Sequence, residues 1–363
     1  MDNGTHHQAP CVAVFLFSKD FLNCTFSPAF RVFAFSVRLR RVVPMSPSRP
    51  PPVLRACLLV AGLLIGLTGC DGMSGGPSAL SSVEFTAEEG WHGQTIRHAG
   101  RTRDFKYYVP PSLPDDAPVV MALHGATIGM GRMFPSAGAG TGSTDWVDIA
   151  REEGLLLVVP DGFHDIDPVW NDCTALPDRG SPDDSGFLAA LADWTTTQAD
   201  VDSSRVFVYG VSNGGQMANR LAIEHPDRFA GIAALISNVN SELGDDQECP
   251  RPTQPVSVLI LSGRSDATTP FDGGGADVWG EPLLSAPATR DFWVANNIQG
   301  TPPPRQPVAF TDDLNGVSCE RTPAPTTGAD VQLCAFDGGH TVPTTESHNF
   351  ESPRLAWDFF RRQ

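Results

Sequence analysis

The segment 206–215 constrains the fold of this chain more than any other. In it, a serine lies between two glycines at the point where a strand-like pattern of residues gives way to a helix-like pattern. Its first four residues are β-branched or aromatic and predict a buried strand, and the apolar positions that follow recur at helical spacing. A strand that turns this sharply into a helix has no room for side chains at Gly210 and Gly214. Ser212 is therefore predicted to lie on a nucleophile elbow.

The helix that follows this turn is predicted at 216–224, where Met217 and Leu221 share one face. Asn213 lies at the N-terminal end of this helix. N–H groups at a helix N-terminus point toward a negative charge. Asn213 is therefore a candidate to stabilise an oxyanion that forms beside Ser212.

Strand-like and helix-like segments alternate over residues 103–361. Strands are predicted at 105–109, 119–123, 155–159, 206–211, 232–236, 256–261 and 331–336, and helices at 146–153, 184–198, 216–224, 287–296 and 353–361. This alternation predicts an α/β fold with a mostly parallel central sheet and helices on both faces. In such sheets, functional side chains lie on loops at the carboxyl ends of the strands.

Two later loops carry the partners that a nucleophilic serine needs. Asp266 follows the predicted strand 256–261, and His340 follows the strand 331–336. A neutral imidazole accepts the proton of the serine, and a carboxylate orients that imidazole. The order Ser, Asp, His is that of α/β-hydrolases. Ser212, Asp266 and His340 are therefore the predicted catalytic residues.

Each partner has an alternative in the sequence. Asp272 and Asp277 lie in the same stretch of chain as Asp266. His348 is an alternative to His340, but it lies further from the strand end and lacks the two preceding glycines. We therefore favour Asp266 and His340.

Six further motifs carry a resemblance to a known family. They are Leu123 to Gly125, Pro160 to Gly162, Trp170 to Asp172, Asp183 to Phe187, Gly263 to Pro270, and Gly338 to His340. Together with the elbow, they show that the chain resembles the polyhydroxybutyrate depolymerase and feruloyl esterase group of secreted α/β-hydrolases. The resemblance spans residues 103–361.

This resemblance implies ester hydrolysis through an acyl-enzyme, without a metal or cofactor. In relatives the Leu-His-Gly motif is commonly followed by cysteine, whose N–H helps to form the oxyanion hole. Ala126 stands there in this chain and keeps that N–H, so Ala126 and Asn213 are the predicted donors. His124, Trp170 and Asn171 are candidates for substrate contact. Alternatively, His124 shapes the oxyanion loop and Trp170 is a packed loop anchor.

The substrate class is left open by the motifs. The predicted substrates are feruloyl or acetyl esters of polysaccharide, or small esters, and the first alternative is hydroxyalkanoate oligomers. Relatives that digest crystalline polyester often append a polymer-binding domain, whereas this chain stops soon after its last predicted helix. A serine peptidase and a non-catalytic envelope-binding lipoprotein are the remaining alternatives.

The N-terminal region resembles a bacterial lipoprotein signal. An apolar stretch at 58–67 follows Arg49 and Arg55 and ends in Leu67-Thr68-Gly69-Cys70, and it is too short to span a membrane. Export and acylation of Cys70 are predicted, with an ordinary secretory signal as the alternative. The predicted order is an over-extended N-terminus at 1–44, a signal peptide at 45–69, a tether at 70–80 and an α/β-hydrolase catalytic domain at 81–363.

Charge excludes one class of partner. The chain has a formal net charge of −17, and its basic residues are enriched before Cys70. A surface this negative repels phosphate backbones, so we expect no nucleic-acid partner. The expected partner is an ester substrate, and the expected membrane contact is made through a lipid on Cys70 alone.

Four cysteines follow Cys70, and in an exported domain they indicate two disulfides. Of the three possible pairings we favour Cys319 with Cys334, because both lie on strand-like segments flanking one loop. Cys173 would then pair with Cys249. The chain contains no Cys-x-x-Cys pair, so a metal site is not expected.

Overall fold

The computed structural model describes Leu80 and residues 83–133, 144–163, 167–172, 182–241, 251–276, 280, 282–310, 314 and 316–363. All of them belong to the unit Cys70–Gln363. The predicted signal peptide, Cys70, Asp277 and the predicted bond between Cys173 and Cys249 lie outside these residues.

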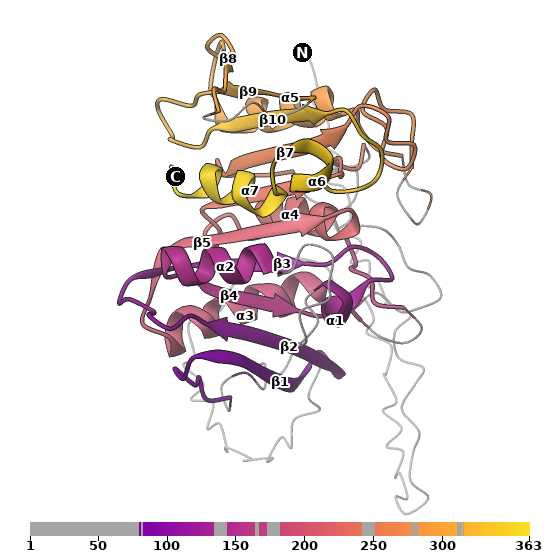
Figure 1. Ribbon diagram of the computed structural model, residues 1–363. Coiled ribbons are helices and arrows are strands. Elements are labelled where there is room, and N and C mark those ends of the chain that lie inside the picture. Colours follow the sequence, from indigo (N-terminus) through magenta and orange to yellow (C-terminus); the bar gives the residue numbers. More distant parts are fainter. Residues whose placement is uncertain are drawn as a thin grey trace, which may run out of the picture. The chain divides into compact units, whose positions relative to one another are not determined.

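The described strands form one ten-stranded sheet in the order β1-β2-β4-β3-β5-β6-β7-β10-β9-β8 (Figure 1). The strands are β1 (Gly90–His98), β2 (Arg101–Val109), β3 (Ala117–Leu123), β4 (Leu156–Pro160), β5 (Val201–Val211), β6 (Gly231–Leu235), β7 (Ser257–Gly263), β8 (Gln306–Pro307), β9 (Val317–Thr322) and β10 (Val331–Phe336). The six central strands from β4 to β10 are parallel, and the pairs at both edges are antiparallel.

Helices cover both faces of this sheet (Figure 1). They are α1 (Gly129–Met133), α2 (Thr144–Glu153), α3 (Asp184–Gln198), α4 (Asn213–Glu224), α5 (Ala286–Asn297), α6 (Thr345–His348) and α7 (Ser352–Phe360). Successive residues of a strand point to opposite faces. In β5, Val208 accordingly joins the core beneath α3, α4 and α5, whereas Tyr209 joins the core beneath α2 and α7. This arrangement confirms the predicted α/β-hydrolase fold.

Five of the six central strands are buried from end to end, and β5 is buried over Val206–Gly210, which explains why these segments are mostly apolar. Every residue of β3, β4, β6, β7 and β10 is buried. Strands covered on both faces lack the alternation of apolar and polar residues that a one-sided sheet shows. Their carboxyl ends therefore lie at one edge of a rigid layer, and loops at that edge can hold side chains in fixed positions.

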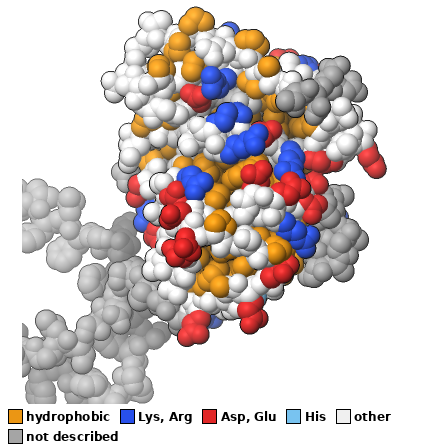
Figure 2. Space-filling model, turned by 60° about the vertical axis from the view of Figure 1, so that its left-hand side comes forward, with side chains coloured by type: hydrophobic (Ala, Val, Ile, Leu, Met, Phe, Trp, Pro, Cys, Tyr) orange, Lys and Arg blue, Asp and Glu red, His pale blue; other side chains and the backbone are white. Residues whose placement is uncertain are grey.

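The outer surface carries charges of both signs. On the face shown in Figure 2, Lys and Arg side chains lie among Asp and Glu side chains and small apolar areas. That face therefore offers an interspersed pattern of charges and not one continuous basic surface. None of the helices within the described part of the chain is long and apolar enough to cross a membrane.

Candidate active site

The tight turn between β5 and α4 places Ser212 in a conformation that side chains rarely adopt. Its backbone angles are φ 54° and ψ −122°, and it is the N-cap residue of α4. A Cβ atom on Gly210 would lie 2.1 Å from the carbonyl oxygen of Gly214, and one on Gly214 would lie 2.5 Å from that of His124. Both positions therefore require glycine, as the motif predicts. The surrounding backbone holds Ser212 in this strained turn.

Three side chains from distant parts of the chain form one hydrogen-bonded row at the carboxyl edge of the sheet. The Ser212 Oγ atom lies 2.9 Å from Nε2 of His340. The other ring nitrogen of His340, Nδ1, lies 2.8 Å from Oδ2 of Asp266. The structure thus brings together the three residues that were predicted from the sequence to be catalytic.

Asp266 is held so that it accepts hydrogen bonds. Its Oδ1 atom accepts the backbone N–H groups of Thr268 and Thr269, each at 2.8 Å, and its Oδ2 atom accepts the Thr269 hydroxyl at 2.8 Å. Its side chain is fully buried. A carboxylate fixed in this way accepts the Nδ1–H of His340, which leaves Nε2 as a proton acceptor facing Ser212.

The alternatives have other surroundings. Asp272 is exposed to solvent. Nε2 of His348 instead lies 2.8 Å from the carbonyl oxygen of Asp337, and its Nδ1 lies 2.7 Å from the Ser347 hydroxyl. His348 is therefore engaged in holding a surface loop and does not contact Ser212.

The two predicted oxyanion donors lie beside Ser212. Ala126 lines the same cavity as Ser212, and Asn213 is the residue that directly follows Ser212 in the chain. Neither backbone N–H has a hydrogen-bond acceptor among the described residues, whereas the N–H of Thr127 donates to the Pro168 carbonyl at 2.8 Å. An N–H group that has no partner within the protein is free to bind an oxyanion.

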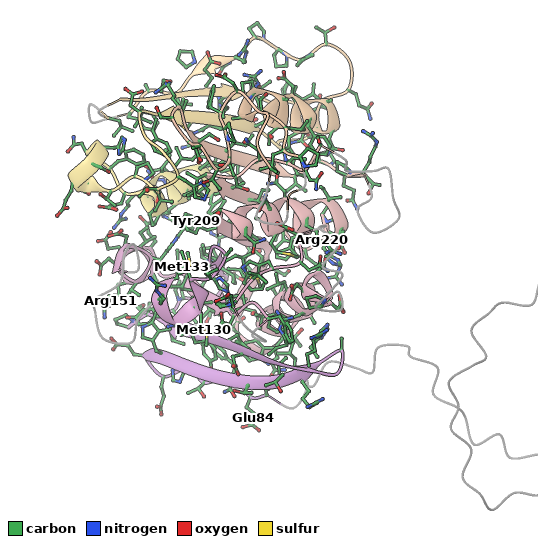
Figure 3. The ribbon with its side chains drawn as sticks, turned by 90° about the vertical axis from the view of Figure 1, so that its right-hand side faces the viewer. Glu84, Met130, Met133, Arg151, Tyr209 and Arg220 are labelled. Carbon is green, nitrogen blue, oxygen red and sulfur yellow. A yellow bond between two sulfur atoms is a disulfide. The ribbon has the colours of Figure 1, made fainter. Side chains whose placement is uncertain are left out.

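A cavity of about 380 Å³ opens at this row of side chains. Ser212, His340 and Ala126 line it together with Met133 and Tyr209, which are labelled in Figure 3. Further lining residues are Gly125, Ile128, Val211, Ile236, Thr341, Val342, Pro343, Thr344, Glu351, Ser352 and Pro353. A largely apolar cavity with a few polar groups is typical of a small-molecule site.

The three predicted substrate contacts do not line this cavity, which corrects that prediction. His124 is completely buried, with Nδ1 lying 2.8 Å from the Gly125 carbonyl and Nε2 accepting the Gly162 N–H at 2.8 Å. Because His124 holds the peptide that precedes Ala126, it shapes the oxyanion loop, which was its alternative role. Asn171 is also buried, and its side chain donates to the Pro182 carbonyl at 3.0 Å.

Trp170 is a packed anchor and not a stacking platform for substrate. It is completely buried, and its indole N–H donates to the His124 carbonyl at 2.9 Å. The Asn213 side chain accepts the N–H of Trp170 at 2.8 Å and donates to its carbonyl at 3.1 Å. Trp170 is therefore enclosed between the oxyanion loop and the start of α4.

Several residues of the site were missed by the sequence analysis. The Asn213 side chain donates to Asp172 Oδ2 at 2.7 Å, which fixes the loop around Trp170. Tyr209 and Ser352 enter the cavity from β5 and from the start of α7. Tyr209 could have been found as an aromatic residue three positions before Ser212, but nothing in the sequence indicated that Ser352 would contact it.

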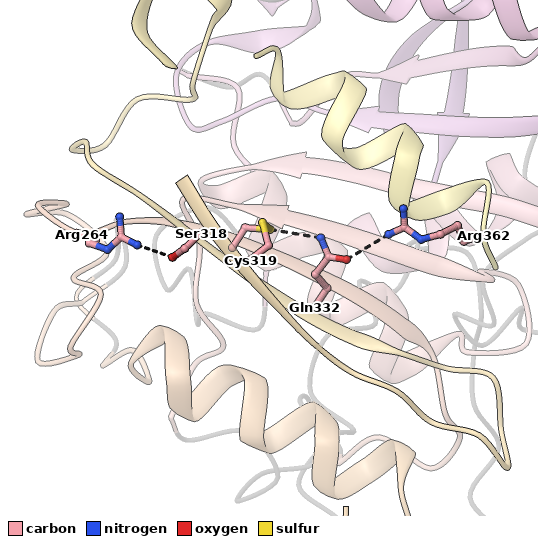
Figure 4. The surroundings of a disulfide bond; sticks show 6 residues. Arg264, Ser318, Cys319, Gln332 and Arg362 are labelled. Atoms are coloured by element: carbon pink, nitrogen blue, oxygen red, sulfur yellow. Dashed lines mark hydrogen bonds between the residues drawn. A yellow bond between two sulfur atoms is a disulfide. The ribbon is translucent and has the colours of Figure 1, made fainter. Parts of the chain in front are cut away.

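The predicted disulfide between Cys319 and Cys334 is present and supports the strand that leads to His340 (Figure 4). The two residues face each other across β9 and β10, with their Cα atoms 4.0 Å apart. The Gln332 side chain donates to Sγ of Cys334 at 3.3 Å and accepts from Arg362 at 3.2 Å. This edge of the sheet is thus held covalently.

No group of three or more His, Cys, Asp or Glu side chains is placed to bind a metal ion within the described ranges.

Comparison with known proteins gives matches to esterases. Residues 183–248, which include the elbow, match the model of the prolyl oligopeptidase family. The putative esterase NocK of Nocardia uniformis subsp. tsuyamanensis is 33% identical over 209 residues, covering 54% of this chain and 57% of the relative. Feruloyl esterase B of Piromyces equi is 26% identical over 218 residues, covering 59% of this chain and 37% of the relative.

Comparison with solved structures gives a match to the acetyl xylan esterase from Aspergillus awamori. It is 19% identical, with a TM-score of 0.49, and the match covers 72% of this chain and 94% of that one. The chain spans about half or less of the length of the curated relatives it matches. The resemblance read from the motifs is confirmed: the chain has the α/β-hydrolase fold, and the curated relatives described above are named esterases.

Proposed function

We propose that this protein is a serine carboxylic-ester hydrolase that works through an acyl-enzyme. The observation that carries the proposal is the hydrogen-bonded row from Ser212 through His340 to Asp266, of which Ser212 and His340 line the cavity. The names of the curated relatives support the same chemistry.

In the proposed reaction, Ser212 Oγ attacks the ester carbonyl and passes its proton to Nε2 of His340. Asp266 stabilises the imidazolium that forms. The N–H groups of Ala126 and Asn213 bind the oxyanion, and loss of one such donor costs about 2.7 to 4 kcal/mol of transition-state stabilisation. The imidazolium protonates the leaving alcohol. A water molecule, deprotonated by the same imidazole, then releases the acid.

The proposed substrates are feruloyl or acetyl esters of polysaccharide, or small esters. Relatives named feruloyl esterase and acetylxylan esterase support this class. The cavity of about 380 Å³ has room for a single small acyl group. A polysaccharide chain would therefore stay outside, with only its acyl group inside.

The test is an ester panel with purified protein. We expect hydrolysis of p-nitrophenyl acetate, which the Ser212→Ala substitution abolishes. Methyl ferulate, acetylxylan, hydroxybutyrate oligomers and a peptide p-nitroanilide then separate the esterase proposal from a depolymerase and a peptidase. A protein that leaves every ester intact but binds an envelope component would be a binding protein, and the proposal would be wrong.

We also propose that the chain is exported and anchored by a lipid on Cys70, with the signal peptide at 45–69, a tether at 70–80 and the catalytic domain at 81–363. The support is the apolar stretch at 58–67 and the residues that follow it. Metabolic labelling with a palmitate analogue in a bacterial host tests this proposal. We expect label in the membrane fraction, lost on Cys70→Ser; unlabelled protein in the medium would indicate an ordinary secretory signal.

A further inference from the structure

The loop that carries the Ala126 N–H is held on both sides of Ala126 by the same stretch of chain. Before Ala126, the carbonyl of His124 accepts the indole N–H of Trp170 at 2.9 Å. After it, the N–H of Thr127 donates to the carbonyl of Pro168 at 2.8 Å. The N–H of Ala126 itself has no acceptor among the described residues. Its direction is therefore determined by the two neighbouring contacts.

The Asn213 side chain binds this stretch of chain, residues 168–172, from the side of α4. Its Oδ1 atom accepts the backbone N–H of Trp170 at 2.8 Å. Its Nδ2 atom donates to the carbonyl of Trp170 at 3.1 Å and to Oδ2 of Asp172 at 2.7 Å. A backbone N–H can only donate and a carbonyl can only accept, so these partners fix which way the amide is turned. All the donors of the Asn213 side chain are thereby used.

These contacts are shielded from water. Asn213, Trp170 and His124 are completely buried, and Asp172 is 5% exposed. The Trp170 ring also packs on the His124 ring, with centroids 4.9 Å apart. Hydrogen bonds are stronger where water is excluded, and a buried network whose members are all satisfied is rigid. A displacement of the segment 168–172 would therefore move the loop that carries Ala126.

We propose that the side chain of Asn213 is a positioning residue that sets the spacing between the two oxyanion donors. Its backbone N–H is one donor, and its side chain holds the segment that directs the other donor, the N–H of Ala126. Both donors must lie about 2.7 to 3.1 Å from the oxyanion to stabilise it, so the rate depends on their spacing. This inference rests on the proposed ester hydrolysis and adds a residue that acts through Trp170.

Other contacts keep the segment 168–172 attached when Asn213 is changed. The N–H of Asn171 donates to Oδ2 of Asp184 at 2.7 Å, and its side chain donates to the Pro182 carbonyl at 3.0 Å. Arg220 donates to the Asn171 carbonyl at 2.8 Å. We therefore expect Asn213 variants to fold, with the segment shifted and not released.

The first experiment measures single-turnover release of p-nitrophenol from p-nitrophenyl acetate with enzyme in excess. Asn213→Ala should lower the acylation rate constant by about 10²-fold, the loss that a misplacement of about 1 Å causes. The dissociation constant of the ester should stay unchanged, because Asn213 does not line the cavity. A weakened affinity with an unchanged acylation rate constant would overturn the inference.

A second asparagine of α4 provides the matched control. Asn219 is 2% exposed, and its side chain donates to the Gly215 carbonyl at 2.9 Å and accepts the indole N–H of Trp293 at 2.9 Å. Asn219→Ala therefore also removes buried hydrogen bonds from α4, but none of them leads to Ala126. It should keep the wild-type acylation rate constant. Equal losses in the two asparagine variants would show a general effect of destabilisation and would overturn the inference.

A double-mutant cycle tests whether Asn213 acts through Trp170. Trp170→Phe keeps a ring but removes the indole N–H, and it should lower the acylation rate constant by about tenfold, as expected for one lost hydrogen bond. Trp293→Phe, at a completely buried tryptophan with its own indole hydrogen bond, should have no such effect. The double variant Asn213→Ala/Trp170→Phe should lose little more than Asn213→Ala alone. Losses that multiply would overturn the inference.

Hydrogen exchange tests the positioning without turnover. The Thr127 N–H should exchange about tenfold faster in Asn213→Ala than in the wild type or Asn219→Ala, because its bond to Pro168 is loosened. Equal exchange in all three proteins, measured by NMR, would overturn the inference. Wild-type acylation in Asn213→Ala would also overturn it and would leave the esterase proposal intact. Absence of any hydrolysis by the wild type would overturn the esterase proposal, and the exchange measurement would still test the contacts.

Discussion

Ser212 and Ser185 each lie within hydrogen-bond distance of a histidine, but the two serines differ in what else they contact. Ser212 Oγ is 2.9 Å from His340 Nε2, and the far nitrogen of that ring faces Asp266. Ser185 Oγ donates to the Glu224 carboxylate and also lies 3.0 Å from Nε2 of His225. The same three kinds of side chain are therefore connected in a different order.

The order of the contacts decides where the protons lie. A serine has one O–H, and that of Ser185 is donated to Glu224. Its oxygen then accepts from His225, so Nε2 of His225 carries a proton and cannot take another from the serine. At Ser212 the carboxylate holds Nδ1–H, and Nε2 of His340 is free to accept. A nucleophilic serine requires the arrangement found at Ser212, in which the histidine lies between the serine and the carboxylate; the presence of the three residue types is not sufficient.

Backbone geometry separates the two serines further. Ser212 has a φ of 54° and lines a cavity, whereas Ser185 is buried in the first turn of α3. Arg220 binds Glu224 at 2.9 Å and the Asn171 carbonyl at 2.8 Å, so the Ser185 cluster joins α3, α4 and the Trp170 loop. We infer that this cluster stabilises the fold and that the Ser212 cluster carries the chemistry.

The largest expected effect comes from removing each hydroxyl in turn. Ser212→Ala should lower kcat for p-nitrophenyl acetate by at least about 10⁴-fold, because the nucleophile is lost. Ser185→Ala should leave kcat close to the wild-type value. Initial rates of the two purified variants check this contrast. Equal losses in both variants would break the comparison.

The acidic partners should differ almost as strongly. Asp266→Asn should lower kcat by about 10⁴-fold, because an amide does not hold the reactive tautomer of His340. Glu224→Gln weakens the pairing with Arg220 and should cost about 1 to 2 kcal/mol of unfolding free energy, with kcat retained. Steady-state rates and urea unfolding measure both variants. Retained activity in Asp266→Asn would remove this residue from the mechanism.

Two glycines give a comparison of intermediate size. Gly214→Ala would place a Cβ 2.5 Å from a backbone oxygen of His124, and backbone cannot move aside. We expect loss of most activity and about 2 kcal/mol of stability. Gly186→Ala meets the Asp183 side chain instead, which would have to give up its N-cap hydrogen bond to the Gly186 N–H, at a cost of about 1 kcal/mol of stability. Because this contact lies outside the cavity beside Ser212, the Gly186→Ala variant should keep its activity. Thermal unfolding and ester hydrolysis check both, and an active Gly214→Ala variant would contradict the elbow geometry.

The smallest expected effect is a pH dependence of stability that originates at the Ser185 cluster. Burial lowers the pKa of His225, so the unfolded chain binds its proton more readily than the folded protein does. Stability should therefore fall as pH drops through about 6.5, the imidazole range of the unfolded chain. His225→Gln should reduce this slope. Urea unfolding between pH 7.5 and 5 measures it, and identical slopes would contradict the account.

Much of the fold could be predicted from the sequence, because the central strands and helices have strong local patterns. The strand Val331–Phe336 and the helix Asp184–Gln198 agree with the predicted bounds. The edge strand β1 was missed, because it is half-exposed and contains Gly90 and Gly93, which weaken a strand signal. The short elements α1, α6 and β8 have too few residues to show a period.

The candidate site was predictable where its residues lie in a local motif or directly after a predicted strand, and it was unpredictable where side chains meet only through packing. Ser212 was found from a local motif, and Asp266 and His340 from their places after strands. Trp170 was open to two interpretations, because a sequence does not show whether a loop side chain faces the cavity or the core. The contact between Tyr209 and Ser352 joins residues that are 143 positions apart, and no local sequence pattern predicts it.

The most direct test of the account is covalent labelling with a fluorophosphonate, which reacts with an activated serine. Intact-mass and peptide mass spectrometry would locate and count the label. We expect one label per chain, on the peptide that contains Ser212, and none in the Ser212→Ala variant. A label on Ser185, or no label on the folded wild-type protein, would contradict the central claim that the order of contacts makes Ser212 the nucleophile.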